Sequence, residues 1–305
     1  MSLYGMFAGK GPSGFGYSST AEEVTAGLDL TGKRYLVTGS NSGIGQETVR
    51  VLGLRGATIV TLARTAEKAT EGVKGFAGTF VPVACELSEP ASVRAAVQTV
   101  LAQGERLDGI LCNAGIMALP KLEQKHGYEL QFLTNHLGHF ILVTGLMDQL
   151  KADGRLVMLS SAAHRNAPSV GIEFDNLAGQ RSYSAWGNYG QAKLANLLVA
   201  RELARRWHDT GRVANAVHPG VIQTNLGRHM GSVISAVMGA FGPLFLKSIP
   251  QGAATQTWAL VHPDAAKVRG EYLADCNVAQ SSTAGRDMNL AERLWTESER
   301  IVAGL

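Results

Sequence analysis

Short apolar segments alternate with longer helical segments along almost all of the 305-residue chain. In each apolar segment, such as 58–63, nearly every residue is hydrophobic, as expected for strands covered on both faces. Repeated alternation of strand and helix requires crossover connections, and these produce a doubly wound parallel sheet. The sequence therefore predicts an α/β fold. Its strands are expected at 34–38, 58–63, 79–84, 108–112, 154–160, 212–217 and 270–274. Its helices are expected at 43–55, 66–74, 90–102, 128–150, 187–207, 251–262 and 288–302.

A glycine-rich turn follows the first predicted strand and leads directly into the first predicted helix. Glycines permit a tight turn and a close approach of ligand to backbone, and the helix start directs free amides and a dipole at an anion. The spacing is Gly-x-x-x-Gly-x-Gly, which differs from the dinucleotide fingerprint Gly-x-Gly-x-x-Gly. Because a strand precedes the turn and a helix follows it, a diphosphate site is favoured over an ordinary turn. The turn consists of Gly39, Ser40, Asn41, Ser42, Gly43, Ile44 and Gly45.

Tyr189 and Lys193 are four residues apart in a predicted helix and therefore share one of its faces. A free tyrosine has a pKa near ~10, and a cation held beside the phenol favours the phenolate. Lowering that pKa by ~3 units would need about 4 kcal/mol, to which a desolvated lysine can contribute. Most such pairs are a half-buried tyrosine beside a solvated lysine, so the pair needs support from other motifs.

Six motifs, in chain order, resemble those of the short-chain dehydrogenase/reductase family, over roughly residues 30–303. The motifs are Thr38-Gly39-x-x-x-Gly43-x-Gly45, Cys112-Asn113-Ala114-Gly115, Thr134-Asn135-His136-Leu137-Gly138-His139-Phe140, Leu159-Ser160-Ser161-Ala162, Tyr189-x-x-x-Lys193 and His218-Pro219-Gly220-Val221-Ile222-Gln223-Thr224. Within the family, the segments 162–188, 250–253 and 272–276 are most similar to the retinol dehydrogenase-like branch.

The resemblance implies a single Rossmann-type domain over residues 30–305, with strand order 3-2-1-4-5-6-7 and helices on both faces of the sheet. In such sheets ligands bind beyond the carboxyl ends of the strands, where all six motifs fall. Residues 1–29 are expected to form an N-terminal arm with a short helix at 20–26. No linker divides the rest of the chain.

The resemblance also implies four catalytic residues, Asn135, Ser161, Tyr189 and Lys193. Tyr189 would act as the general acid and base, and Ser161 would donate a hydrogen bond to the substrate oxygen. Lys193 would hold the cofactor ribose and, together with an oxidised nicotinamide ring, lower the pKa of Tyr189, while Asn135 would place a water beside Lys193. Because side chains alternate along a strand, only one of Ser160 and Ser161 should face the site.

The same resemblance predicts the cofactor contacts and a nicotinamide dinucleotide as the cofactor. Asn113 is interpreted as mainly structural, with a cofactor contact in addition. Beyond the glycine-rich turn, the expected contacts are Asn113, Ala114, Gly115, Tyr189, Lys193, Pro219, Gly220, Val221, Ile222 and Thr224.

The second predicted strand ends without the acidic residue that would bind an adenosine ribose hydroxyl. Arg64 stands there instead and suits a 2′-phosphate, which favours NADP(H); a solvated Arg64 would leave NAD(H) open. After the third strand Glu86 replaces the family's usual aspartate near the adenine. The backbone of Leu87 is the better supported of these two contacts.

Composition and charge argue against several other classes of protein. A net charge of +3 without a basic cluster gives no reason to expect nucleic acid. Three scattered cysteines lack the spacing of metal ligands and of a disulfide framework, which favours a reducing compartment. No secretory signal and no transmembrane segment is evident, so a cytoplasmic protein is predicted, with peripheral membrane contact left open. A homodimer and a homotetramer are both open.

The substrate is expected to be a small lipophilic or aromatic molecule. The largely apolar segment 226–247 and the segment 162–188, with Phe174, Tyr183 and Trp186, are expected to line its pocket. The predicted function is NADP(H)-dependent interconversion of a carbonyl compound and its alcohol.

The motifs that several alternative functions would need are missing from the sequence. The histidines at positions 136, 139, 164 and 218 have no zinc-binding spacing, and no Gly-x-Ser-x-Gly elbow follows a central strand, so they are interpreted as packing or pocket-lining residues. A nucleotide-sugar epimerase would need Gly-x-x-Gly-x-x-Gly and a longer substrate domain. A catalytically idle NADP(H)-binding redox sensor stays open, although such proteins usually lose the catalytic tyrosine or lysine.

Overall fold

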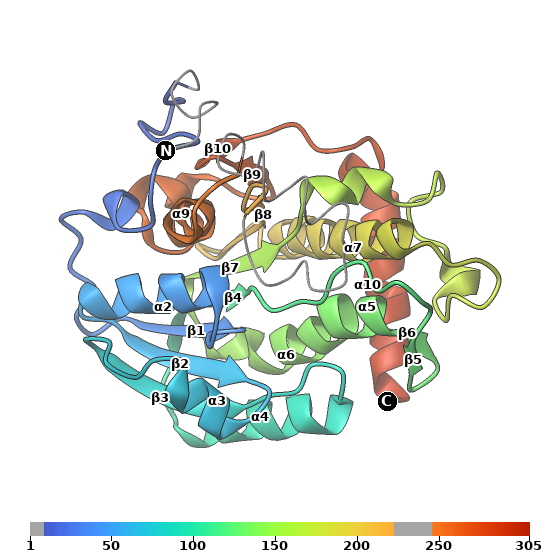
Figure 1. The fold of residues 1–305 in the computed structure, drawn as a ribbon, viewed down its shortest axis with the longest axis horizontal. Helices are drawn as coiled ribbons and strands as arrows, with labels where there is room; N and C mark the ends of the chain where they lie inside the picture. Colours follow the sequence, from blue (N-terminus) through green and yellow to red (C-terminus); the bar gives the residue numbers. More distant parts are fainter. Residues whose placement is uncertain (1–8, 223–245) are drawn as a thin grey trace.

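A computed structural model describes residues 9–222 and 246–305, and its centre is one eight-stranded sheet (Figure 1). The strand order is β10-β9-β8-β7-β4-β1-β2-β3, and every neighbouring pair is parallel except β9 and β10. Counted along the chain without the edge strand β10, this is the predicted order 3-2-1-4-5-6-7. The strands are β1 (Arg34–Thr38), β2 (Thr58–Ala63), β3 (Thr79–Ala84), β4 (Leu107–Cys112), β7 (Leu150–Leu159), β8 (Val213–His218), β9 (Tyr272–Ala274) and β10 (Asn277–Val278).

Helices cover both faces of this sheet, and each face has its own apolar core. On one face α2 and α9 pack together against the central strands, while α4, α6 and α7 cover the other face and α10 packs on α7 (Figure 1). Because both faces are covered, every residue of β1 and β4 is buried, which explains their continuous apolar sequences. The longer helices are α2 (Gly43–Leu54), α3 (Ala66–Glu71), α4 (Pro90–Ala102), α6 (Gly138–Leu146), α7 (Ala185–Arg206), α9 (Ile249–Val261) and α10 (Met288–Ala303).

The helix predicted at 128–150 is wrong as a single element. It is divided into α5 (Leu130–Phe132), a π-helical turn η2 (Leu133–Leu137), α6 and a 3₁₀ turn η3 (Met147–Gln149). Its first residues belong instead to a small hairpin, β5 (Gln124–Lys125) and β6 (Tyr128–Glu129). Other short helices are η4 (Ala162–Asn166), η5 (Phe174–Asn176), η7 (Pro263–Lys267) and η8 (Ala284–Arg286).

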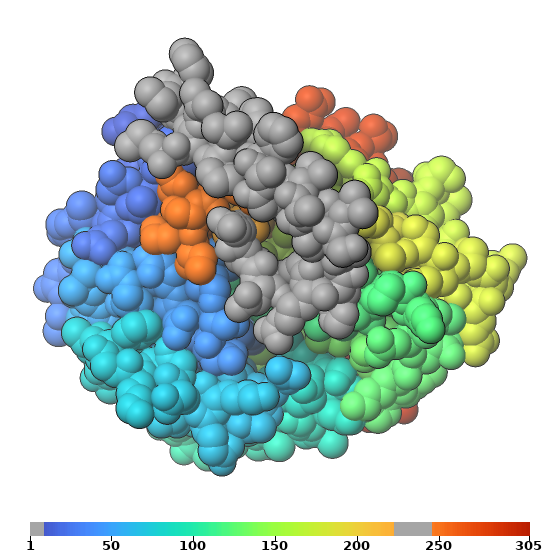
Figure 2. Space-filling model, in the orientation of Figure 1, coloured from blue at the N-terminus to red at the C-terminus, as the bar shows by residue number. Residues whose placement is uncertain are grey.

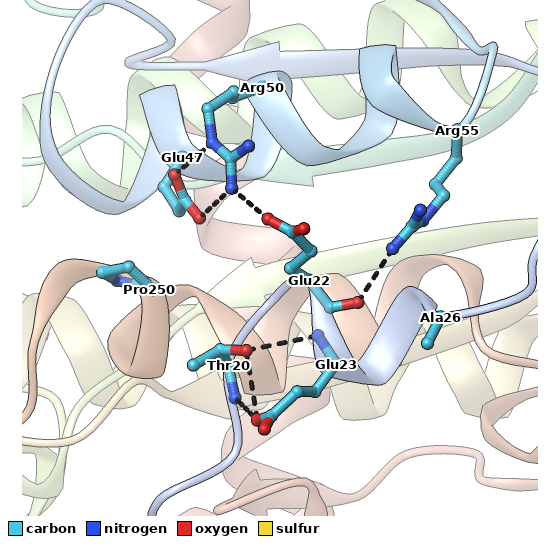
Figure 3. A pocket seen from close by; sticks show the side chains of 8 residues that line it. All are labelled: Thr20, Glu22, Glu23, Ala26, Glu47, Arg50, Arg55 and Pro250. Atoms are coloured by element: carbon cyan, nitrogen blue, oxygen red, sulfur yellow. Dashed lines mark hydrogen bonds and ion pairs between the residues drawn. The ribbon is translucent and has the colours of Figure 1, made fainter.

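The described part of the N-terminal arm, residues 9–29, is fastened to α2 and α9. The helix expected at 20–26 is only the 3₁₀ turn η1 (Glu23–Thr25). Figure 3 shows Arg50 of α2 bound to Glu47 and to Glu22 of the arm, at 2.8 and 2.9 Å. Arg55 donates to the Glu22 carbonyl at 3.1 Å. A surface hollow of about 460 Å³ lies here, in which Arg50 pairs with Glu22 and Glu47 while the Glu23 carboxylate accepts from Thr20.

The carboxyl ends of the parallel strands meet at one edge of the sheet. On the face drawn in Figure 2, blue and cyan residues lie on one side and green and yellow residues on the other. A Cβ on Gly39 would lie 3.0 Å from the Ala114 Cα, and one on Gly115 would lie 3.4 Å from the Lys193 Nζ of α7. The glycine-rich turn and the Tyr189 helix therefore flank a common region. In residues 9–222 and 246–305 no helix has the length and apolar character needed to cross a membrane.

Candidate active site

The glycine-rich turn after β1 has the geometry of an anion site. Gly39 and Gly43 have φ of 68° and 58°, which favours glycine at both positions. A Cβ on Gly45 would lie 2.3 Å from the Gly39 carbonyl oxygen, so only glycine allows the start of α2 to approach the turn this closely. At Gly43 the space beyond the backbone is open, and the Ser42 side chain does not cap the helix. The first amides of α2 are therefore available to a phosphate.

The other predicted residues of this turn divide between packing and exposure. Ser40 is buried and its hydroxyl donates to the Leu62 carbonyl at 3.2 Å, so its side chain stabilises the turn. Ile44 is buried in the core against α9. Asn41 is partly exposed and Ser42 is exposed, so their side chains can face a ligand.

Arg64 directly follows β2 and is exposed to solvent. Among the described residues its guanidinium has no hydrogen bond or ion pair, so it can bind a phosphate. The Glu86 carboxylate is engaged by Ser88, which donates to it from its amide at 3.2 Å and from its hydroxyl at 3.0 Å. The Leu87 side chain is buried in the core, so its backbone is the part that can face a ligand.

Asn113 connects the ends of two central strands. Its Nδ2 donates to the Thr38 carbonyl at 2.9 Å, and its Oδ1 accepts from Gln256 of α9 at 3.2 Å. The amides of Asn113 and Ala114 donate to the Thr38 hydroxyl at 2.9 and 3.0 Å. These contacts support the structural interpretation of Asn113 and bring Gly115 to the cofactor side of the sheet.

Tyr189 and Lys193 lie on one face of α7, as their spacing predicts. The Lys193 ammonium is 5.6 Å from the centre of the Tyr189 ring and donates to the Leu159 carbonyl at 3.0 Å. Ser161 is partly exposed and its side chain acts on the Tyr189 phenol to lower its pKa, whereas Ser160 is buried and its hydroxyl donates to the Lys193 carbonyl at 2.8 Å. Of the two serines, Ser161 therefore contacts the tyrosine.

Asn135 is fully buried in the π-helical turn η2. Its Oδ1 accepts from the Ile116 amide at 2.8 Å and its Nδ2 donates to the Ile116 carbonyl at 2.9 Å. A Cβ on Gly115 would lie 2.9 Å from the Asn135 Oδ1 and 3.4 Å from the Lys193 Nζ. Asn135, Gly115 and Lys193 therefore meet, and the Asn135 amide fixes the backbone beside the ammonium.

The sequence-based expectation of a lowered Tyr189 pKa applies to the site with an oxidised nicotinamide bound, and the protein alone differs from it. Burial raises the pKa of Tyr189 to about 12, and the hydrogen bond from Ser161 offsets only part of that rise. Burial also lowers the pKa of Lys193 to about 8, because no carboxylate in the described residues pairs with its ammonium. The expected lowering of the tyrosine pKa is therefore absent from the protein without its cofactor.

Two buried histidines in the Asn135 segment serve different contacts. His139 Nδ1 lies 2.9 Å from the Asn135 carbonyl, so this nitrogen carries the proton and Nε2 accepts from the Thr38 hydroxyl at 2.9 Å. His139 thus connects the π-helical turn that contains Asn135 with the end of β1. His136 packs near α10, with its Nε2 2.8 Å from the Ser298 hydroxyl. From the sequence both are interpreted as packing or pocket-lining residues, because no local motif marks the His139 contacts.

The loop after β8 is held by a lysine that the sequence motifs did not single out. Lys247 is almost fully buried, donates from its amide to the Val221 carbonyl at 2.9 Å and pairs with Asp275 at 2.5 Å. Gly220 has φ of 93°, and a Cβ there would lie 2.7 Å from the Lys247 side chain. Pro219 and Ile222 are partly exposed beside it, whereas Thr224 lies outside the described residues.

The aromatic residues expected to line the substrate pocket lie in different places. Trp186 is 40% exposed and its ring is 6.1 Å from that of Tyr189, so it can line the pocket. Tyr183 donates to the Leu119 carbonyl at 2.6 Å. Phe174 packs under the Arg293 guanidinium of α10 at 4.0 Å, away from Tyr189. Residues 226–245 of the predicted pocket segment 226–247 lie outside the described residues.

Comparison with known proteins agrees with this geometry. The family model described as short chain dehydrogenase matches residues 33–233. "Short-chain dehydrogenase TIC 32 A, chloroplastic" of Brassica napus is 41% identical, with all of both chains covered. Human retinol dehydrogenase 13 is 36% identical over 90% of this chain and 85% of its own.

Solved structures show the same fold. An uncharacterised protein from Mycobacterium paratuberculosis superposes with a TM-score of 0.76 at 28% identity, covering 92% of this chain and 97% of its own. A blue fluorescent protein from a metagenomic library, in complex with NADPH, has a TM-score of 0.62 at 26% identity, covering 81% and 97%. This chain belongs to the short-chain dehydrogenase/reductase family of oxidoreductases, with retinol dehydrogenases among its relatives.

Proposed function

We propose that this protein is an NADP(H)-dependent oxidoreductase that interconverts a lipophilic or aromatic carbonyl compound and its alcohol. The observation that carries the proposal is the convergence of Tyr189, Ser161, Lys193 and Asn135 at the carboxyl edge of the sheet. The glycine-rich turn lies at the same edge, where strand ends in such sheets meet their ligands.

In the proposed reaction one proton and one hydride are transferred, and each side chain of the site has a separate role. The bound cofactor supplies or accepts the hydride. In carbonyl reduction the Tyr189 hydroxyl, with its raised pKa, donates a proton to the substrate oxygen, and Ser161 donates a hydrogen bond to the same oxygen. The Lys193 ammonium donates one hydrogen to Leu159, so its others remain for the cofactor ribose. Asn135 holds the backbone at residue 116 beside that ammonium.

The preference for NADP(H) rests on Arg64. It is exposed and unpaired among the described residues, and no carboxylate ends β2. A planar guanidinium binds a 2′-phosphate well, whereas a ribose hydroxyl would call for an acidic partner. The NADPH complex of the metagenomic relative supports the same cofactor.

The substrate class rests on Trp186 and on the relatives. An exposed indole beside Tyr189 offers a flat apolar surface to a ring or an alkyl chain. Several relatives are named retinol dehydrogenases, and retinol is lipophilic. The proposal concerns this chemical class and does not extend to retinoids in particular.

The decisive experiment is a panel of lipophilic aldehydes, ketones and alcohols, followed by absorbance of the reduced nicotinamide. Tyr189→Phe should reduce turnover by about 10²–10⁴-fold with cofactor affinity unchanged, because the hydroxyl carries the proton. Lys193→Ala should weaken both turnover and cofactor binding. Cofactor binding without turnover of any substrate would favour the redox-sensor alternative.

The cofactor preference has its own test. NADPH should bind at least about tenfold more tightly than NADH, and Arg64→Ala should remove most of that difference. Arg94→Ala, which changes an exposed arginine of α4, is the matched control. An unchanged ratio in Arg64→Ala would refute the role of Arg64. The cytoplasmic location and the homodimer or homotetramer remain predictions, and the Brassica relative is named as chloroplastic.

A further inference from the structure

His164 lies directly behind the serine that contacts Tyr189. It is 1% exposed, follows Ser161 by three residues in η4 and packs against the Tyr272 ring, with ring centres 4.8 Å apart. Its Nδ1 is 2.6 Å from the Ser161 carbonyl oxygen, and its Nε2 accepts from the Ser282 amide at 2.9 Å. Each ring nitrogen therefore has one backbone partner.

These partners determine the tautomer of the ring. The Ser282 amide can only donate, so Nε2 must be the unprotonated nitrogen. The Ser161 carbonyl can only accept, so Nδ1 must carry the hydrogen. A second proton would place an N–H against the Ser282 amide. Burial lowers the pKa of His164, and the nearby Arg165 and Arg201 guanidiniums act in the same direction.

We propose that His164 is a positioning residue that orients the Ser161 hydroxyl toward the substrate oxygen by holding the Ser161 carbonyl and tying it to the C-terminal segment at Ser282. This inference rests on the proposed function, because it assigns a role through Ser161. It does not place His164 in contact with substrate or cofactor.

The surroundings of the turn favour a role in orientation. The Ser161 carbonyl also accepts from the His164 amide at 3.1 Å, so His164 donates to this carbonyl through both its amide and its ring. From the other side, the Ala162 amide donates to His218 Nδ1 at 3.2 Å. A Cβ on Gly190 would lie 2.5 Å from the Ala163 carbonyl, so the turn packs against the residue that follows Tyr189. A small shift of the carbonyl would therefore move the serine relative to the tyrosine.

The two ring nitrogens can be replaced separately. In His164→Asn, the amide nitrogen can occupy the place of Nδ1 and keep the bond to Ser161. In His164→Gln, the amide can occupy the place of Nε2 and keep only the bond to Ser282. We expect kcat to fall about tenfold in the Gln variant, less than the loss from removing a direct oxyanion donor, and to be largely restored in the Asn variant. The Kd for NADPH should be the same in both.

A double-mutant cycle with Ser161→Ala separates orientation from general support of the fold. If His164 acts through Ser161, His164→Gln should cause no further loss of kcat in the Ser161→Ala background. A full tenfold loss in that background would overturn the inference and leave the proposed function intact. Wild-type turnover in Ser161→Ala alone would instead overturn the role of Ser161 in the proposed function, and with it the catalytic effect of His164.

The hydrogen bonds can be checked without any turnover. Nitrogen-15 NMR of the imidazole in the full-length protein should show a neutral ring protonated at Nδ1 at pH 7. A ring protonated at Nε2, or an imidazolium, would overturn the geometry whatever the activity of the variants.

Discussion

Acid should destabilise this protein partly through one buried histidine. His139 is fully buried, and both of its ring nitrogens are engaged, by Asn135 and by Thr38. Burial lowers the pKa of His139 to about 4, the Lys193 ammonium adds to that effect, and the bond to the Asn135 carbonyl opposes it. An unfolded histidine has a pKa near ~6.5. The unfolded chain therefore takes up a proton before the folded chain does.

The size of the effect follows from these two pKa values. Stability from His139 is fully present above pH ~6.5 and is lost as the pH falls toward about 4, since the unfolded state binds more protons in that window. The complete loss is about 3 kcal/mol, and about 2 kcal/mol of it is lost by pH 5. A domain of this kind has only ~5–15 kcal/mol in total, so the change is measurable.

Urea unfolding at pH 8 and pH 5 provides the assay. His139→Gln removes the titrating ring. Between pH 8 and pH 5 the free energy of unfolding of this variant should therefore fall by about 2 kcal/mol less than the free energy of unfolding of the wild type. The comparison uses the change with pH, so stability lost through the substitution itself cancels. Equal slopes in the wild type and His139→Gln would refute the reasoning.

Three other substitutions test the cofactor and substrate sides. Gly45→Ala should weaken NADPH binding at least about tenfold, because its Cβ would lie 2.3 Å from the Gly39 carbonyl; fluorescence titration measures this, and an unchanged Kd would contradict it. Lys247→Met should also weaken cofactor binding, because it removes the cation that pairs with Asp275. Asp275→Asn, which removes the other partner, is the comparison. A Kd for NADPH that neither change affects would mean that the pair does not support the loop after β8. Trp186→Ala should raise KM for aromatic aldehydes several-fold more than for short aliphatic ones, and an equal change in both would remove Trp186 from the pocket.

Much of the fold follows from local sequence. The strands predicted at 34–38 and 58–63 match β1 and β2 to the residue, because a strand covered on both faces needs an unbroken apolar run. The strand predicted at 79–84 matches β3, although only Val83 of this edge strand is buried. The prediction of one helix at 128–150 is wrong because an apolar run hides a local irregularity. Its apolar residues are nearly continuous, so their periodicity does not reveal the π-helical turn in which Asn135 bonds to Ile116.

The candidate site divides in the same way. Tyr189, Lys193 and the glycine-rich turn have short-range spacing that a sequence displays directly. The long-range contacts of His139 and His164 do not, because their partners Thr38 and Ser282 are 101 and 118 residues away. Nothing within a local window can show which of the eight histidines in the sequence meets such a partner.

Burial accounts for the main disagreement between the sequence and the site. The spacing of Tyr189 and Lys193 predicts a stabilised phenolate, yet low polarity penalises both charges, so it raises the pKa of Tyr189 to about 12 and lowers the pKa of Lys193 to about 8. With a pKa of about 12, forming the phenolate at pH 7 costs about 7 kcal/mol in the protein alone. A protonated Tyr189 is the form that carbonyl reduction needs. Alcohol oxidation needs the phenolate, so positive charge from an oxidised cofactor would have to offset most of that cost. In the proposed mechanism, the protein without its cofactor therefore holds Tyr189 in the protonated form that can donate a proton.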